Sequence, residues 1–159
     1  MLDRAMFIAT FVAAISSGLV AGIFFAFSTF VMAALGRLPA EQGIAAMNSI
    51  NVTVINPLFM LAFMGTGVLC LLLAGTSYLW WGHAGGKLIL VASLLYVIGC
   101  VGVTMVFNVP LNDALAAVKT VTPEGAALWS KYLGTWTFWN HVRTVAPLIS
   151  AILFTLALI

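Results

Sequence analysis

Charged side chains are scarce in this sequence. Of its 159 residues, six are Lys or Arg and four are Asp or Glu, so 6% are charged, against about 25% in an ordinary soluble domain. With so few scattered cations and a net charge of +2, the chain lacks the basic surface that binding to nucleic acid requires. An apolar content of 64% excludes a disordered chain. The composition predicts a membrane protein that does not bind nucleic acid.

Motifs for metals and cofactors are also missing. The two histidines, His83 and His141, are expected at opposite ends of the predicted helix bundle, so they are not expected to share one metal ion. The sequence has no Glu-x-x-His motif or paired carboxylates for a di-iron centre. It also has no P-loop or dinucleotide fingerprint. From these absences we predict that the protein binds no metal ion and no cofactor.

Long uncharged runs dominate the chain instead. They cover residues 5–36, 42–86, 88–112 and 144–159. A membrane-spanning helix needs about 20 mostly apolar residues, and the alternating pattern of a β-barrel is missing. We therefore predict an all-α, integral membrane four-helix up-down bundle that forms a single domain over residues 1–159. The predicted spans are about 5–35, 57–81, 88–107 and 141–159.

The first connection contains signals for a short interfacial helix. Pro39 suits a first helical turn and Glu41 favours its positive end, so a helix is predicted to run to about Asn51. Asn56 followed by Pro57 is typical of an N-cap and the first helical position. This pair predicts the start of the second span.

The third connection is predicted to begin where the third span ends. Asn108 suits a left-handed residue that closes a helix, and Pro110 disfavours its continuation. Asn112 is then expected to cap a short interfacial helix over Asp113–Val118. Capping alone would account for both asparagines.

The last helix is longer than a membrane requires. Thr122 and Pro123 predict its start, and 37 residues to Ile159 span about 55 Å against a hydrocarbon core of about 30 Å. Pro147 is the expected bend, and it frees the carbonyl of Arg143. Residues at spacings of three and four form one face of this helix: Trp129, Tyr132, Leu133, Trp136, Asn140 and Arg143.

Polar side chains converge at one end of this predicted bundle. In an up-down topology the first and third connections lie on the same side, which gathers Asn48, Asn51, Asn56, Asn108, Asn112, Asp113, Asn140, His141 and Arg143. Ionisable groups facing the interior of a membrane bundle usually mark a site. The alternative stays open: Arg143 snorkels to the headgroups, the asparagines are caps, and Trp136 and Trp139 form an interfacial belt.

Three segments resemble a known family. They are Met47-Asn48-Ser-Ile-Asn51-Val-Thr-Val-Ile-Asn56-Pro57, Asn108-Val-Pro110-Leu-Asn112 and Trp136-Thr-Phe-Trp139-Asn140-His141-Val-Arg143-Thr144. In this order between four spans, they are similar to the anthrone oxygenase-like family of small membrane proteins. The resemblance implies oxidation of a lipophilic, enolisable aromatic, of the anthrone-to-anthraquinone type, by molecular oxygen without a metal or flavin.

The expected chemistry assigns roles to the converging residues. Arg143 and Asn140 are expected to stabilise the oxyanion. His141 is the first candidate base, because imidazole exchanges protons near neutral pH, and Asp113 is the second. On a regular helix, however, His141 points about 100° away from Asn140. The substrate is expected to bind the aromatic and amide side chains Trp136, Trp139, Asn48, Asn51, Asn56, Asn108 and Asn112.

A non-catalytic interpretation competes with the oxygenase. The chain would then bind a lipid or quinone, or support a larger membrane complex. The expected partners are the lipid bilayer and a lipophilic aromatic molecule. Gly18 and Gly22 form a small-residue stripe that packs within the bundle or in a homo-oligomer, and Cys70 and Cys100 lie at similar depth. We expect a bacterial cytoplasmic membrane, and the excess of cations on the polar side leans that side towards the cytoplasm.

Overall fold

The protein folds into a bundle of long helices. The structure is a computed structural model that describes residues 4–82, 84–118 and 122–159, and these residues form helices and no strands. The α-helices are α1 (Arg4–Ala26), α2 (Met32–Leu35), α3 (Ala40–Thr53), α4 (Pro57–Met60), α5 (Thr66–Thr76), α6 (Ala84–Tyr96), α7 (Val109–Ala117) and α8 (Pro123–Ala157).

Short segments of π- and 3₁₀-helix join several of these elements end to end. They are η1 (Phe27–Val31), η2 (Leu61–Gly65), η3 (Ser77–Trp80), η4 (Val97–Gly102) and η5 (Thr104–Asn108). The result is four helices long and apolar enough to cross a membrane: Arg4–Leu35, Pro57–Trp80, Gly85–Ala117 and Pro123–Ala157. The prediction of an all-α bundle with four such helices is confirmed.

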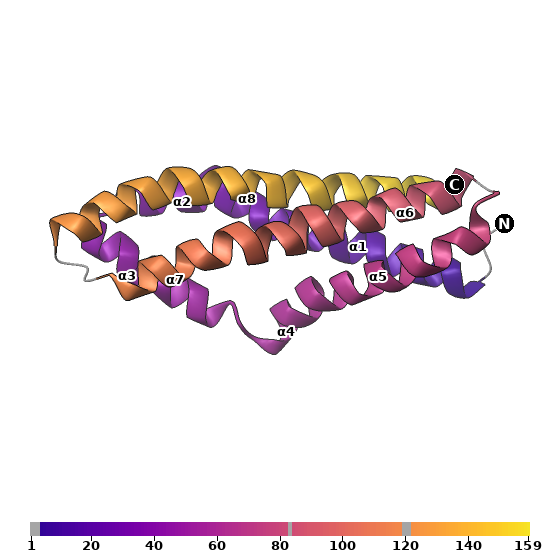
Figure 1. Ribbon diagram of the computed structural model, residues 1–159, viewed down its shortest axis with the longest axis horizontal. Coiled ribbons are helices and arrows are strands. Elements are labelled where there is room, and N and C mark those ends of the chain that lie inside the picture. The colour runs from indigo at the N-terminus through magenta and orange to yellow at the C-terminus, as the bar shows by residue number, and fades with distance from the viewer. Residues whose placement is uncertain (1–3, 83, 119–121) are drawn as a thin grey trace.

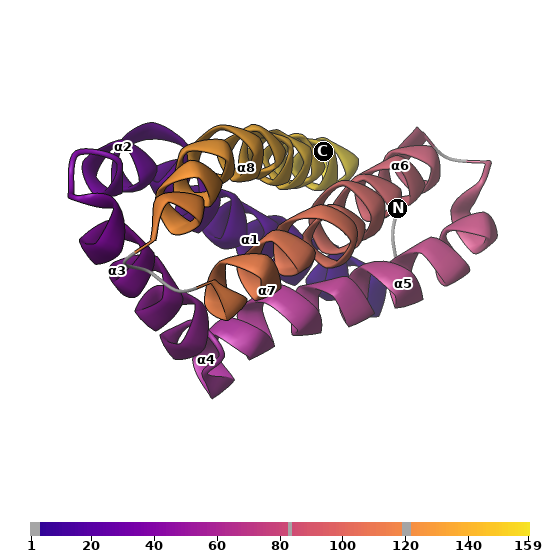
Figure 2. The ribbon, with the colours of Figure 1, turned by 60° about the vertical axis from the view of Figure 1, so that its left-hand side comes forward.

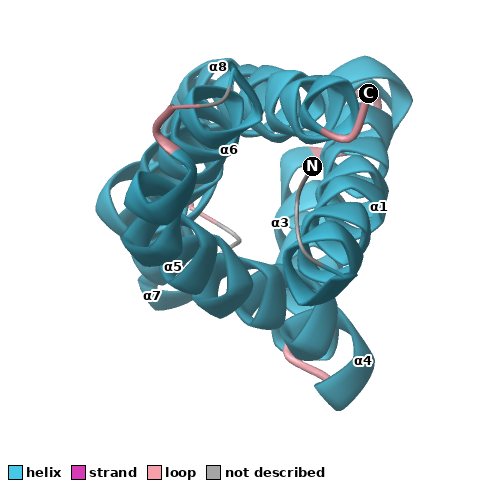
Figure 3. Cartoon of the chain, turned by 90° about the vertical axis from the view of Figure 1, so that its right-hand side faces the viewer, coloured by secondary structure: helices cyan, strands magenta, loops and turns pink. Residues whose placement is uncertain are grey.

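The four long helices run up and down around a common axis. The start of α1, the end of α8 and the turn between α5 and α6 lie at one end, whereas α3 and α7 lie at the other (Figure 1). Viewed along the axis, the helices form a ring (Figure 3). Within the ring α8 packs between α1 and α6, and α5 packs against α6 and α1. The first and third connections therefore share one end of the bundle, as predicted.

Two predicted N-caps are present. The Oδ1 of Asn56 accepts a hydrogen bond from the backbone N of Phe59 at 3.0 Å, and Asn56 has an extended backbone. The Oγ1 of Thr122 accepts from the backbone N of Gly125 at 3.1 Å. Each bond satisfies one of the N–H groups that the first turn of a helix leaves free.

The helix end predicted at Asn108 is wrong. Asn108 has φ −79° and ψ −39°, which is right-handed helical geometry, and the helix continues without a break into α7. Pro110 is tolerated because it lies in the first turn of α7, directly after the π-helical turn η5, where the hydrogen-bond spacing of the helix changes. Asn112 therefore lies inside a helix, and α7 continues the third long helix instead of starting a separate one.

The helices approach closely where small residues meet. A Cβ built on Gly99 would lie 2.5 Å from the Cβ of Ala146, so the Gly99 region and α8 are in direct contact. Nearby, the Oγ of Ser150 donates to the backbone O of Ala92 at 2.8 Å. A Cβ built on Gly18 would lie 3.9 Å from the Cβ of Ala151 in α8, at ordinary van der Waals distance. Such close packing holds helices together where lipid offers no hydrophobic driving force.

The buried apolar side chains form two clusters. One joins α1, α5, α6 and the end of α8, and it includes Cys70 and Cys100, which are free thiols. The other lies towards the opposite end and joins α2, α3, α7 and the first half of α8. Figure 2 shows α3 running across that end of the bundle, beside α7. The polar residues of the last helix lie between these two clusters.

Candidate functional site

A pocket occupies the junction between the two clusters. Its volume is about 290 Å³, near the lower limit of the roughly 300–1,000 Å³ typical of small-molecule sites. Its apolar wall includes Phe24, Phe27, Met47, Ile50, Phe59, Met60, Phe63 and Met64. The polar side chains that line it are Asn51, Thr104, Asn112, Trp136 and Arg143. All four long helices and α3 contribute to this wall.

Arg143 is the only charged side chain among the residues that line this pocket, and it is 4% exposed. Its Nη2 donates to the Oδ1 of Asn140 at 2.8 Å, and its Nη1 lies 3.4 Å from the Oγ1 of Thr104. The guanidinium carbon lies 4.4 Å from the ring centroid of Phe24 and 4.8 Å from that of Trp136. Arg143 thus faces the interior of the bundle, and the snorkelling interpretation is wrong.

The cation has no carboxylate partner among the described residues. Its Nε is buried without any hydrogen-bond partner. Burying a charge costs several kcal/mol unless it is well compensated. The pocket therefore presents a positive charge that an oxyanion could neutralise.

Asn140 holds Arg143 in this position. Its Nδ2 donates to the backbone O of Phe24 and to the Oγ of Ser28, both at 2.8 Å. Because the amide nitrogen is engaged with α1 and η1, the Oδ1 is left to accept from Arg143. The spacing of three residues places both side chains on one face of α8, as predicted. Asn140 is fully buried and does not line the pocket itself.

Trp136 contacts the guanidinium of Arg143 with its ring face and bonds a second polar side chain, that of Asn112, with its N–H group. Its Nε1 donates to the Oδ1 of Asn112 at 2.8 Å, and the hydroxyl of Tyr132 donates to the same oxygen at 2.7 Å. Asn112 and Trp136 both line the pocket. Trp136 is 4% exposed, so it is a buried part of the site and the belt interpretation is wrong for this residue.

Of the other asparagines predicted for the site, one lines the pocket and three do not. Asn51 of α3 lines the pocket, and its Nδ2 is buried without a partner. Asn108 is fully buried, donates to the backbone O of Trp136 at 3.2 Å and does not line the pocket. Asn48 is half-buried and does not line the pocket, and Asn56 is an exposed cap.

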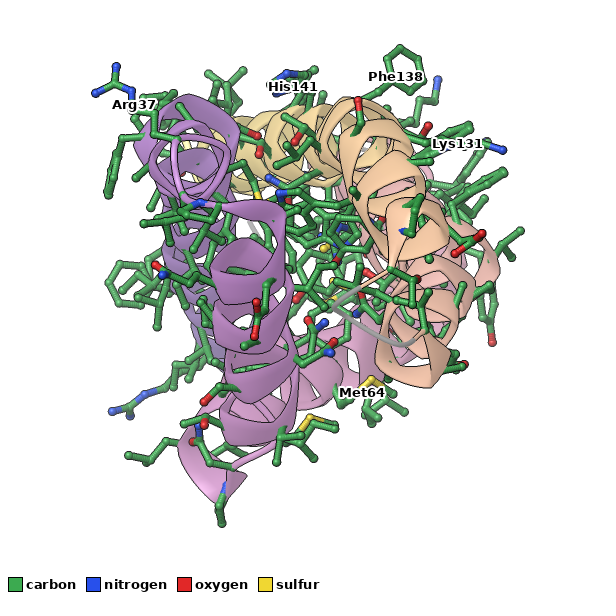
Figure 4. The ribbon with its side chains drawn as sticks, turned by 90° about the vertical axis from the view of Figure 1, so that its left-hand side faces the viewer. Arg37, Met64, Lys131, Phe138 and His141 are labelled. Carbon is green, nitrogen blue, oxygen red and sulfur yellow. The ribbon has the colours of Figure 1, made fainter. Side chains whose placement is uncertain are left out.

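Both candidate bases lie outside the pocket. His141 is exposed and points away from the bundle (Figure 4), because it follows Asn140 directly and is rotated by about 100° around the helix. Asp113 is also exposed, on the outer face of α7. Trp139 stacks on Phe107, with ring centroids 3.6 Å apart, and is not part of the wall. The structure does not bring these three side chains to the site.

Three contributors were missed by the sequence reasoning. Phe24 stacks on the guanidinium, Thr104 approaches it, and Ser28 anchors Asn140. No periodicity or motif distinguishes them from ordinary residues of a membrane helix. In the structure, the π-helical turns η1, η2 and η5 mark this level, and such turns are frequent at functional sites.

A comparison with protein families establishes which family the chain belongs to. The model of the anthrone oxygenase family matches residues 59–153. The chain belongs to this family. The matched stretch includes Thr104, Asn112, Trp136 and Arg143, whereas α1 and α3 lie outside it. Nothing among the curated proteins or the solved structures matches the chain.

The described residues do not bring three or more His, Cys, Asp or Glu side chains together in a metal-binding group. The polar part of the pocket consists instead of two amides, one hydroxyl, an indole and one guanidinium. Such groups hold an oxygen-bearing ligand by donating hydrogen bonds.

Proposed function

We propose that the protein is a membrane-embedded oxygenase, resident in a bacterial cytoplasmic membrane, that converts a lipophilic anthrone-type aromatic into the corresponding quinone. The support is its family and the pocket, in which one buried cation faces an apolar, aromatic wall. The reaction uses molecular oxygen and requires neither a metal nor a flavin.

The proposed chemistry balances without another co-reactant. An anthrone has a methylene carbon opposite its carbonyl, and loss of one proton from that carbon gives a delocalised enolate. The enolate donates electrons to O₂, and a carbon–oxygen bond forms to give a peroxide. Loss of the second proton and cleavage of the O–O bond leave a carbonyl and release water. One oxygen atom ends in the quinone and the other in water.

Arg143 is the observation that carries the proposal. A neutral ketone gains negative charge on its oxygen as the proton leaves, and a fixed guanidinium in a site of low dielectric stabilises that charge. The side chain is held before the substrate arrives by Asn140 and by two aromatic faces. In this proposal Arg143 binds the substrate oxygen. Water accepts the proton, because none of the side chains lining the pocket is Asp, Glu or His.

The test is oxidation of emodin anthrone by purified protein in detergent or lipid nanodiscs. Quinone formation, followed by absorbance, is expected to exceed the spontaneous rate and to consume one O₂ for each quinone formed. A panel of anthrones that bind but are not oxidised faster than in empty nanodiscs would support the binding-protein alternative.

Replacing His141 by alanine is expected to leave this oxidation within about twofold of the wild-type rate. The side chain is exposed and points away from the pocket, and surface substitutions usually change little. The measurement is kcat/KM for emodin anthrone. A loss of about 10²-fold, typical of removing a general base, would restore His141 as the base.

Access to the pocket is predicted to lie on the outer face of the bundle. Met64 and Met105 line the pocket and are 39% and 58% exposed, and Figure 4 shows Met64 at the periphery, on the side opposite His141. A Met64→Trp substitution is expected to lower kcat/KM several-fold for an anthrone supplied from the bilayer. Val68→Trp is the control, because Val68 is 55% exposed one turn further on and does not line the pocket. Equal rates in the two variants would contradict this route.

A further inference from the structure

The pocket has polar groups besides Arg143 that the proposed oxidation does not use. Asn112 and Asn51 both line it, from α7 and α3 respectively. Neither belongs to the hydrogen bonds that hold the guanidinium. What these two amides present to a ligand follows from their neighbours.

The orientation of the Asn112 amide is determined by its partners. An indole N–H is a donor only, so the atom that faces the Nε1 of Trp136 at 2.8 Å must be the oxygen of Asn112. The hydroxyl of Tyr132 donates to the same oxygen at 2.7 Å. The Nδ2 group therefore points elsewhere, and it has no hydrogen-bond partner among the described residues. Because Asn112 lines the pocket, this N–H₂ group is available to a ligand.

Asn51 adds a second amide donor beside the first. The Tyr132 hydroxyl has given its proton to Asn112, so its oxygen faces the amide of Asn51 as an acceptor. The two groups do not reach hydrogen-bond geometry, and the Nδ2 of Asn51 is buried without a partner. A buried N–H group that lacks a partner is costly. An oxygen atom of a bound ligand would satisfy both amides.

These donors lie at a different part of the pocket from the cation. Arg143 lies over the face of the Trp136 ring, whereas Asn112 lies at the N–H edge of the same indole. The wall between and around them is aromatic and aliphatic. A flat ligand whose first oxygen is at Arg143 thus meets Asn112 and Asn51 with another part of its ring system.

We propose that the Nδ2 groups of Asn112 and Asn51 form a second oxygen-binding subsite, which selects ring systems that carry an additional hydroxyl or carbonyl group. This inference rests on the proposed function, in which Arg143 holds the first oxygen. The substrate class is narrowed accordingly, from lipophilic aromatic ketones in general to those with a second oxygen substituent on the rings. A site built to bond such an oxygen discriminates against the analogue that lacks it, because its donors are then left unpaired.

The test measures equilibrium binding of ligands that cannot be oxidised by this route. Fluorenone is a tricyclic aromatic ketone without an enolisable hydrogen, and its monohydroxy derivatives place a second oxygen around the ring system. Dissociation constants are measured by calorimetry with the full chain in nanodiscs. At least one hydroxyfluorenone is expected to bind about tenfold more tightly than fluorenone, as one well-formed hydrogen bond allows.

Two substitutions then test whether the two amides cause the preference for hydroxyfluorenone over fluorenone. In Asn51→Ala the preference is expected to fall to within about twofold, with fluorenone affinity and thermal stability unchanged, because the Asn51 Nδ2 has no partner to lose. In Asn112→Ala the preference is expected to disappear as well, although this change also unpairs Trp136 and Tyr132. Gln42→Ala removes an exposed amide from the same helix as Asn51 and is expected to retain the full preference.

The outcomes separate this inference from the proposed function. Equal affinity for fluorenone and every hydroxyfluorenone, or a preference that survives in Asn51→Ala, would overturn the subsite even if anthrones are oxidised. A preference that depends on Asn51 would support the subsite even if no anthrone is turned over. Binding is thus measured independently of oxidation.

Discussion

Replacing Arg143 by methionine is expected to lower the rate of anthrone oxidation by about 10²- to 10³-fold, the loss usual for one oxyanion-stabilising group. The side chain is 4% exposed, lines the pocket and has no carboxylate partner among the described residues. Methionine has a similar length and keeps apolar contact with Phe24 and Trp136. The measurement is kcat/KM for emodin anthrone, corrected for the spontaneous rate.

The same variant is expected to be no less stable than the wild type, which is unusual for a substitution of a buried residue. Removal of a buried charge that has no carboxylate partner relieves a desolvation cost of several kcal/mol, while the Oδ1 of Asn140 loses its bond to the guanidinium, worth about 1.5–3 kcal/mol. The melting temperature of Arg143→Met is therefore expected not to fall. Full activity in this variant would refute the assigned role. Loss of activity together with a collapsed melting temperature would indicate that Arg143 is needed for folding instead.

Arg143→Lys is the matched comparison. It keeps the positive charge but loses the planar fork that bonds Asn140 and stacks on aromatic rings. We expect an activity between those of the wild type and Arg143→Met. A lysine variant as inactive as the methionine variant would mean that geometry, and not charge alone, limits the reaction.

Replacing Gly99 by alanine is expected to destabilise the bundle by about 1–3 kcal/mol, the range for overpacking a close contact. The added Cβ would lie 2.5 Å from the Cβ of Ala146, and neither atom can move without its backbone. The third and fourth long helices must therefore separate at this level. The measurement is thermal or denaturant unfolding in a single detergent.

A compensating substitution makes this prediction specific. In the double variant Gly99→Ala with Ala146→Gly, the clash is removed, and most of the lost stability is expected to return, less about 1 kcal/mol for a glycine inside a helix. Gly75→Ala is the control, because a Cβ there meets no heavy atom within 4 Å. Equal stability in Gly99→Ala and Gly75→Ala would show that the two helices are not tightly packed at Gly99.

The long helices could be predicted from local signals. Scarce charge and apolar length located the spans, and the side chains of Asn56 and Thr122 marked helix starts because capping depends on a few adjacent residues. The pairing of Asn140 with Arg143 followed from helical spacing alone. Each of these features depends on residues close together in the chain.

The continuation of the third helix could not be predicted in this way. Asn108 and Pro110 are typical of a helix end, but the π-helical turn η5 accommodates the proline. The Oδ1 of Asn112 is taken by Tyr132 and Trp136 of another helix. These bonds join residues about twenty positions apart in the chain, so local preference gave no sign of them.

The site was predicted in part for the same reason. Asn51, Asn112, Trp136 and Arg143 do line one pocket, because the topology brings the first and third connections to the same end. Whether a residue faces inward is decided by its rotation around the helix, and this separates Arg143 from the exposed His141. Phe24 and Ser28 come from the first long helix, and nothing in their local sequence connects them with residues more than a hundred positions later.

The position of the pocket between two apolar clusters has a consequence for how the protein holds together. Phe24 and Phe63 belong to one cluster, Met47 and Trp136 to the other, and all four line the pocket. A bound aromatic molecule would touch both clusters at once and complete a continuous core along the bundle axis. Its binding free energy then adds to the cohesion between the two halves of the protein, so the ligand acts as a structural component as well as a substrate.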